Sequence, residues 1–163
     1  MTDLEGMHSY FWLTSSRLRK PLQDDVPYTT QALRHDLARV RIAWEACQAS
    51  RDRNAIYGYL TAVFDLVMWW AAEDRAISRA RWTLRLQGAD SPTTDEPFAA
   101  IILCTADRKK VDKRTRSKWS RVLRYAAEYK TGAEPLAAFV RRKGGINKCV
   151  ERFTRCLGRG GQY

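Results

Sequence analysis

Glycine and proline are scarce in this chain, which has 9 and 5 of them in 163 residues. An all-β sandwich or barrel needs turn residues about every 8 to 12 positions, so this composition disfavours both architectures. Apolar residues recur at helical rather than alternating spacing in every segment longer than ten residues. We therefore expect an all-α fold, with a helical bundle body, a long central apolar helix and a basic C-terminal unit of three helices.

Histidine is rarer still, and no cysteine pair has the spacing of a zinc site. His8 and His35 lie far in sequence from all four cysteines. We expect reduced thiols buried in the core of a cytoplasmic protein, with two of them seven residues apart on one helix face. The four cysteines are Cys47, Cys104, Cys149 and Cys156.

Catalytic motifs are also missing, because the chain has neither a phosphate-binding GxxxxGK[ST] loop nor a GxGxxG turn. The internal carboxylates Asp65 and Asp74 would fall on nearly opposite faces of a helix, which prevents them from sharing one metal ion. We expect Glu73 and Asp74 to pair with nearby arginines (Arg75, Arg79 or Arg81). The sequence thus predicts no catalytic residue, no metal and no cofactor, and a protein that is not an enzyme.

No secretory leader is recognisable, because acidic residues precede the short apolar run 10–13 and no small-residue cleavage site follows it.

Composition divides the chain into three parts. We expect an N-terminal arm over 1–28, a helical body over 29–96 and a basic helical unit over 97–163, with a boundary near 88–97. A loop is expected from Gly88 to Glu96, and Pro97 fits the first position of the next helix.

The body should contain two main helices. The first is expected to begin after Thr29 or Thr30, to end near Ser50 and to bury Trp44. The next segment, 55–72, carries a single charge, Asp65, and is typical of a core helix or a short membrane span.

Its length and its mid-span carboxylate favour the core, so no membrane partner is expected. We expect this helix to continue to about Gln87 with a kink near Glu73. Part of its surface is predicted to meet a second copy in a homodimer, through Phe64, Met68, Trp69 and Trp70.

Charge is distributed very unevenly. The chain has 29 basic and 18 acidic residues, but residues 105–163 hold 17 of the basic and only 5 of the acidic ones. The last third therefore carries a net charge of +12, and the rest carries −1. A polyanion partner is indicated, with nucleic acid first, then an acidic membrane surface and then an acidic protein; the other interpretation is a surface charged for solubility.

The densest basic tract covers 107–118, with seven basic side chains in twelve positions. Such density neutralises phosphates without reading sequence. A helix should begin at Thr115 or Ser117, with Arg114, Lys118, Arg121 and Tyr125 on one stripe. Trp119 heads its apolar stripe and belongs to the core or stacks on an exposed base. The predicted phosphate contacts are Lys109, Lys110, Lys113, Arg114, Arg116, Lys118 and Arg121.

Two further short helices follow, over 136–142 and 148–157, separated by a Gly144-Gly145 turn and with Asn147 as the second N-cap. Together with the preceding helix they partly resemble a helix-turn-helix. With Gly145 as the turn glycine, Ile146 fits the pattern but Arg141 and Glu151 depart from it. With Gly144 as the turn glycine instead, Val150 fits the pattern, but Gly145 and Val140 depart from it.

The final helix should bury Cys149, Val150, Phe153, Cys156 and Leu157. Its outward residues are candidates for nucleic-acid contact, because Asn suits adenine and Arg or Lys suits guanine. These candidates are Asn147, Lys148, Arg152 and Arg155.

Two functions are compatible with these patterns. The first is a small basic nucleic-acid-binding protein, with duplex DNA as the preferred ligand, acting as a transcription regulator or accessory factor. The second is a helical adaptor or inhibitor whose basic face binds an acidic or nucleic-acid-handling protein.

Overall fold

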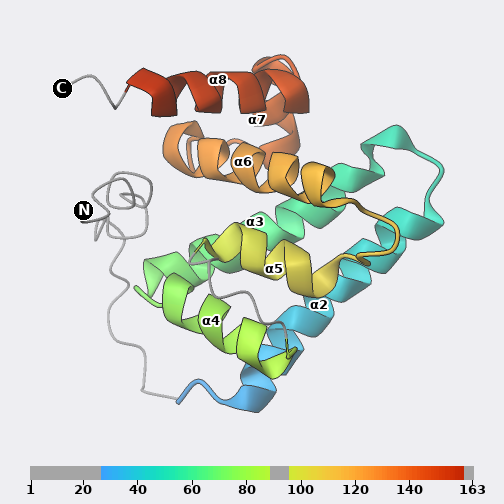
Figure 1. The fold of residues 1–163 in the computed structure, drawn as a ribbon, viewed down its shortest axis with the longest axis vertical. Coiled ribbons are helices and arrows are strands. Elements are labelled where there is room, and N and C mark those ends of the chain that lie inside the picture. The colour runs from blue at the N-terminus through green and yellow to red at the C-terminus, as the bar shows by residue number, and fades with distance from the viewer. Residues whose placement is uncertain (1–26, 89–95, 160–163) are drawn as a thin grey trace.

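The computed structural model describes residues 27–88 and 96–159, which form seven α-helices and one short 3-10 turn and contain no strand (Figure 1). The prediction of an all-α fold is confirmed. Most of the expected arm, residues 89–95 of the expected loop and the last four residues lie outside the described residues. The elements are α2 (Thr30–Ala49), η4 (Arg53–Ala55), α3 (Ile56–Ala72), α4 (Ala76–Leu86), α5 (Pro97–Thr105), α6 (Lys113–Tyr129), α7 (Leu136–Arg142) and α8 (Ile146–Arg159).

Helix α3 lies at the centre of the bundle and contacts α2, α4, α5, α6 and α7. Helix α8 packs on α6, at the end of the molecule away from α4, and α5 lies between α4 and α6 (Figure 1). One continuous core runs from Leu33 on α2 to Phe153 on α8. That core crosses the expected boundary near 88–97, and the division into body and basic unit stays a prediction.

Helix α2 forms where the sequence predicts it. The Thr29 hydroxyl accepts a hydrogen bond from the Ala32 N–H at 3.1 Å and caps the first turn. Trp44 is only 6% exposed and meets the ring of Tyr59 edge-on, with 5.0 Å between ring centroids. The predicted burial of Trp44 is therefore confirmed.

The prediction of one long helix over 55–87 is wrong, because α3 ends at Ala72 and α4 is a separate helix. Asp74 adopts a left-handed conformation with φ of 61°. The Asp74 N–H donates to the Ala71 carbonyl, and the Arg75 N–H donates to the Trp70 carbonyl at 2.9 Å. This pair of bonds is a Schellman motif, which ends a helix. The predicted ion pair between Glu73 and Arg79 does form, at 2.5 Å.

The apolar segment Arg53–Ala72 is long and apolar enough to cross a membrane by length and composition alone. In this fold Tyr59, Val63 and Val67 lie in the protein core, as the sequence predicts for a central helix. Of the four side chains expected to meet a second copy, Phe64 and Trp70 are buried within the chain, whereas Trp69 is 47% exposed. A homodimer stays a prediction, with Trp69 as its exposed contact.

Helix α5 begins at Pro97, as the sequence predicts, and its N-cap is Glu96. The Glu96 carboxylate accepts from the Phe98 N–H at 2.9 Å and the Ala99 N–H at 2.6 Å. Burial raises the pKa of Glu96 to about 7, although these N–H groups and the Arg124 guanidinium favour its charged form. The carboxyl group therefore holds a proton more tightly in the folded chain than in the unfolded one.

The stability of the protein should consequently fall as the pH rises from about 4.5 to about 7, because the folded state releases its Glu96 proton only near the upper value. Over this pH range the titration of Glu96 should lower the free energy of unfolding by about 3 kcal/mol. Urea midpoints at several pH values should show this decline, and Glu96→Gln should flatten it. An equal pH slope in the variant would show that other groups cause the decline.

Candidate nucleic-acid interface

The turn that joins α5 to α6 is held by Asp107. Its carboxylate accepts from the Lys109 N–H at 2.9 Å, and its carbonyl accepts from the N–H groups of Lys110 and Val111. Val111 is buried and fixes the turn to the core, whereas the side chains of Lys109 and Lys110 are exposed. The turn thus presents two neighbouring lysines from a fixed backbone.

Helix α6 begins at Lys113, earlier than the predicted Thr115 or Ser117, because Asp112 is its N-cap. The Asp112 carboxylate accepts from the Thr115 N–H at 2.7 Å. Hydrogen bonding from the Thr115 side chain, and then from its backbone, lowers the pKa of Asp112. Lys113 and Arg114 are therefore exposed in the first helical turn rather than in a loop.

The core face of α6 is confirmed, but the predicted basic stripe needs a correction. Tyr125 is buried against the ring of Phe139, with 5.6 Å between centroids, and does not lie on the basic face. Arg121 is exposed, and Lys118 is half-buried. Arg116 is half-buried as well, and its guanidinium donates to the Val111 carbonyl at 2.7 Å, so this arginine braces the turn.

Trp119 belongs to the core. It is 8% exposed and lies edge-on to both Trp44 and Tyr59, with 6.3 and 6.0 Å between ring centroids. A base could therefore reach the edge of this indole, but it could not stack on a freely exposed face.

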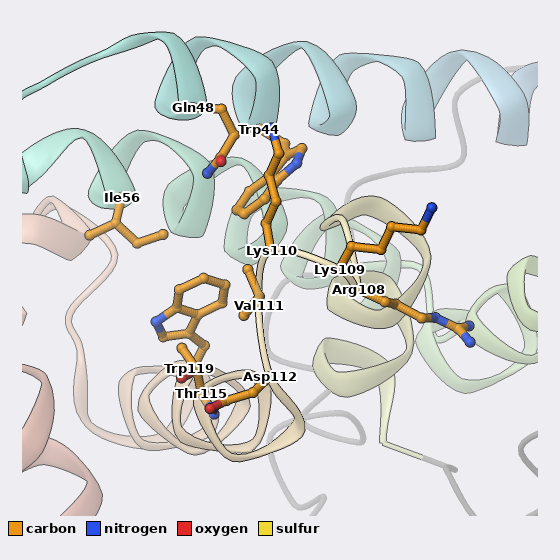
Figure 2. A pocket seen from close by; sticks show the side chains of 10 residues that line it. All are labelled: Trp44, Gln48, Ile56, Arg108, Lys109, Lys110, Val111, Asp112, Thr115 and Trp119. Atoms are coloured by element: carbon orange, nitrogen blue, oxygen red, sulfur yellow. Dashed lines mark hydrogen bonds between the residues drawn. The ribbon is translucent and has the colours of Figure 1, made fainter.

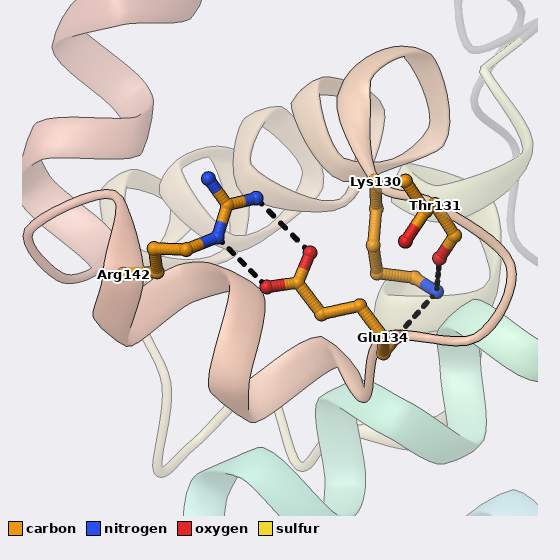
Figure 3. A network of polar contacts seen from close by, with 4 residues as sticks. All are labelled: Lys130, Thr131, Glu134 and Arg142. Carbon is orange, nitrogen blue, oxygen red and sulfur yellow. Dashed lines mark hydrogen bonds and ion pairs between the residues drawn. The ribbon is translucent and has the colours of Figure 1, made fainter.

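Four of the five carboxylates of the last third accept hydrogen bonds or form ion pairs within the chain. Asp107 and Asp112 cap backbone N–H groups. Glu134 accepts two hydrogen bonds from Arg142, at 2.8 and 3.0 Å, beside Lys130, whose ammonium binds the Thr131 and Glu134 carbonyls (Figure 3). Glu128 is exposed near Arg124, and the fifth carboxylate, on α8, is described below.

Seven cations around the start of α6 form no ion pair with a carboxylate anywhere in residues 27–88 and 96–159. Six of them are exposed, and Lys118 is half-buried. We call this group the α6 basic surface. Its members are Arg108, Lys109, Lys110, Lys113, Arg114, Lys118 and Arg121.

Helix α8 begins at Ile146, and the Gly145 carbonyl accepts its first bond from the Cys149 N–H at 3.1 Å. Asn147 therefore lies in the first turn and is not the N-cap, which corrects the prediction. The glycine turn itself forms as expected, with φ values of 99° at Gly144 and 96° at Gly145. A β-carbon at Gly144 would lie 3.0 Å from the side chain of Lys148, so the turn needs glycine there.

The outward residues of α8 are exposed as predicted, but two of its cations share one carboxylate. Lys148 and Arg155 both pair with Glu151, at 3.3 and 2.5 Å. Asn147 and Arg152 are exposed, and Arg152 forms no ion pair with the described residues. Arg152 is therefore more available than Lys148 and Arg155.

The inward face of α8 is shorter than predicted. Cys149 and Phe153 are buried, but Cys156 and Leu157 are exposed, Leu157 by 52%. The Tyr129 hydroxyl, at the end of α6, donates to the Cys156 sulfur at 3.6 Å. Helix α6 ends there, so the last turn of α8 has no core to cover it. The prediction that all four thiols lie in the core is thus wrong for Cys156.

Helices α6 and α8 run in the same direction. The Arg124 guanidinium lies over the ring of Phe153, and Tyr129 contacts Cys156 one turn further along both helices. The N-terminal ends of the two helices consequently face the same end of the bundle (Figure 1). This arrangement brings the exposed Lys148 to the end that carries Lys113 and Arg114.

A cavity that the sequence did not predict lies beside the α6 basic surface, with a volume of about 640 Å³. Figure 2 shows Trp44 of α2 and Trp119 of α6 among the side chains that line it, with Lys110 extending alongside Trp44. Gln48, Ile56 and Thr115 also line it. These residues come from separate segments, so no local pattern in the sequence could reveal the cavity.

The chain matches no family model, no curated protein and no solved structure. Among the residues that the structure describes, no group of three histidine, cysteine or acidic side chains lies close enough to hold a metal ion.

Proposed function

We propose that this protein is a small helical nucleic-acid-binding protein that contacts the phosphates of duplex DNA through the α6 basic surface. The observation that carries the proposal is the concentration of cations near the start of α6. Seven cations there form no ion pair with the described residues, and the two carboxylates beside them, Asp107 and Asp112, accept hydrogen bonds from backbone N–H groups. A regulator or accessory factor of DNA is the corresponding biological role.

Phosphates would replace the water and counterions that surround these cations. Each neutralised phosphate releases counterions, and this release supplies affinity that does not depend on base sequence. The cations lie on a pinned turn and on the first half of a helix, so their backbone is already ordered before binding. Little backbone conformational entropy is then lost at the interface.

The unit of α6, α7 and α8 is compatible with a recognition role for α8, as a partial likeness to a helix-turn-helix suggests. Arg152→Ala should then relax the preference at one base position by about 1 to 3 kcal/mol. Site selection from a pool of random duplexes measures this preference. Arg155→Ala is the matched control, because Arg155 is paired with Glu151. If the unaltered protein selects no consensus sequence, α8 does not read bases. The same conclusion follows if Arg152→Ala lowers the affinity for all duplexes equally.

The proposed function is tested by titrating the full chain with random-sequence duplex DNA, single-stranded DNA and structured RNA, followed by fluorescence anisotropy. We expect duplex binding that weakens as salt is added. An acidic polypeptide, polyglutamate, serves as the competitor. Failure of all three nucleic acids to bind while polyglutamate binds would overturn the proposal and support the adaptor function.

A further inference from the structure

The cavity beside the α6 basic surface has the chemistry of a binding site for a single base. We propose that it accepts one unpaired base of a nucleic-acid strand while the neighbouring lysines hold the phosphates of that nucleotide. This proposal rests on the proposed function and adds the ligand of the cavity to it.

The cavity is of suitable size, and its lining combines apolar walls with polar and charged side chains. Its volume of about 640 Å³ lies within the range of about 300 to 1,000 Å³ that is usual for ligand pockets. Trp44, Trp119, Ile56 and Val111 supply apolar walls. Both indoles are nearly buried and are fixed by their contact with each other and with Tyr59. A planar base would thus meet walls that need no rearrangement.

One polar side chain distinguishes a base from an apolar occupant. Gln48 is exposed on α2 and lines the cavity, and its amide group can both donate and accept hydrogen bonds. The edge of a base carries donors and acceptors that satisfy such a group. The apolar side chain of an acidic peptide would cover the amide without pairing it, which costs free energy. The lining therefore favours a base over a peptide anchor.

The charge around the cavity completes a nucleotide site. Arg108, Lys109 and Lys110 all line it, and Lys110 extends beside Trp44 (Figure 2). Lys113 and Arg114 follow at the start of α6. A strand whose base enters the cavity would place its phosphates among these cations. A base in an intact duplex is paired and stacked, so only an unpaired or extruded base could enter.

The test compares three probes of equal length by fluorescence anisotropy at one salt concentration: a single strand, the same strand with abasic sites throughout, and a blunt duplex of two fully paired strands. Gln48→Trp fills the mouth of the cavity and leaves every cation in place. Gln31→Trp is the control, because Gln31 is exposed on the same helix about 25 Å away. Both positions face solvent, so neither change should disturb folding, which circular dichroism verifies.

The unaltered protein should bind the base-bearing strand about tenfold more tightly than the abasic strand, because only a base can pair with the Gln48 amide. Gln48→Trp should reduce this ratio to below about twofold, while Gln31→Trp keeps it. Equal affinity for the two strands, or a ratio that survives Gln48→Trp, overturns the base site while leaving phosphate binding by the α6 basic surface intact. If the duplex and both strands fail to bind, the proposed function fails as well. Tighter binding of an acidic peptide carrying one tryptophan, lost in Gln48→Trp, would assign the cavity to a protein partner.

Discussion

Trp44→Ala should lower the free energy of unfolding by about 3 to 5 kcal/mol. The indole is 6% exposed and contacts both Tyr59 and Trp119, so its removal leaves a cavity where three elements meet. Neighbouring side chains cannot fill that space without leaving their rotamers. The effect should therefore lie in the upper range for a core substitution.

Urea denaturation monitored by far-ultraviolet circular dichroism measures this loss. Trp69→Ala is the matched control, because it removes the same side chain from a position that is 47% exposed. The control should lose less than about 1 kcal/mol. Similar losses in the two variants would show that the junction of α2, α3 and α6 is not packed as described.

Reversing two charges at the start of α6 should produce the largest change in binding. The double variant Lys113→Glu and Arg114→Glu should bind random duplex DNA about 100-fold more weakly, because two attractions to phosphate become repulsions. The slope of log affinity against log salt should become shallower by about two. Glutamate in the first turn of a helix is favourable, so the variant should keep α6 folded.

The control carries the same change of charge on another surface. Arg34 and Arg39 are exposed on α2, outside the α6 basic surface, and Arg34→Glu with Arg39→Glu alters net charge equally. Anisotropy titrations of the two double variants should differ by at least tenfold in affinity. Equal losses would mean that net charge alone, rather than a defined surface, attracts the nucleic acid.

Two helix ends show what the sequence can and cannot predict about this fold. Helices α3 and α7 both end in a Schellman motif. In α7 the left-handed residue is Gly144, which local sequence marks as a stop, and the end was predicted. In α3 the same position is Asp74, which takes this conformation less readily than glycine, and the sequence predicts only a kink near Glu73 where the helix ends.

Only part of the candidate site could be predicted, because local sequence does not record side-chain partners or tertiary packing. The number and positions of the cations follow directly from the sequence, but their partners do not. The pairing of Lys148 and Arg155 with Glu151, and the bracing role of Arg116, depend on side-chain geometry. The cavity depends on tertiary packing between α2, α3 and α6, which no local spacing records.

The salt dependence of duplex binding by the intact chain tests the central claim most directly. Affinity for a random-sequence duplex should be measured by anisotropy between about 50 and 200 mM salt, the range over which phosphate contacts change affinity strongly. If the seven cations of the α6 basic surface each neutralise one phosphate, log affinity against log salt should have a slope near about −6. A slope shallower than about −2, or no binding at low salt, would contradict the account.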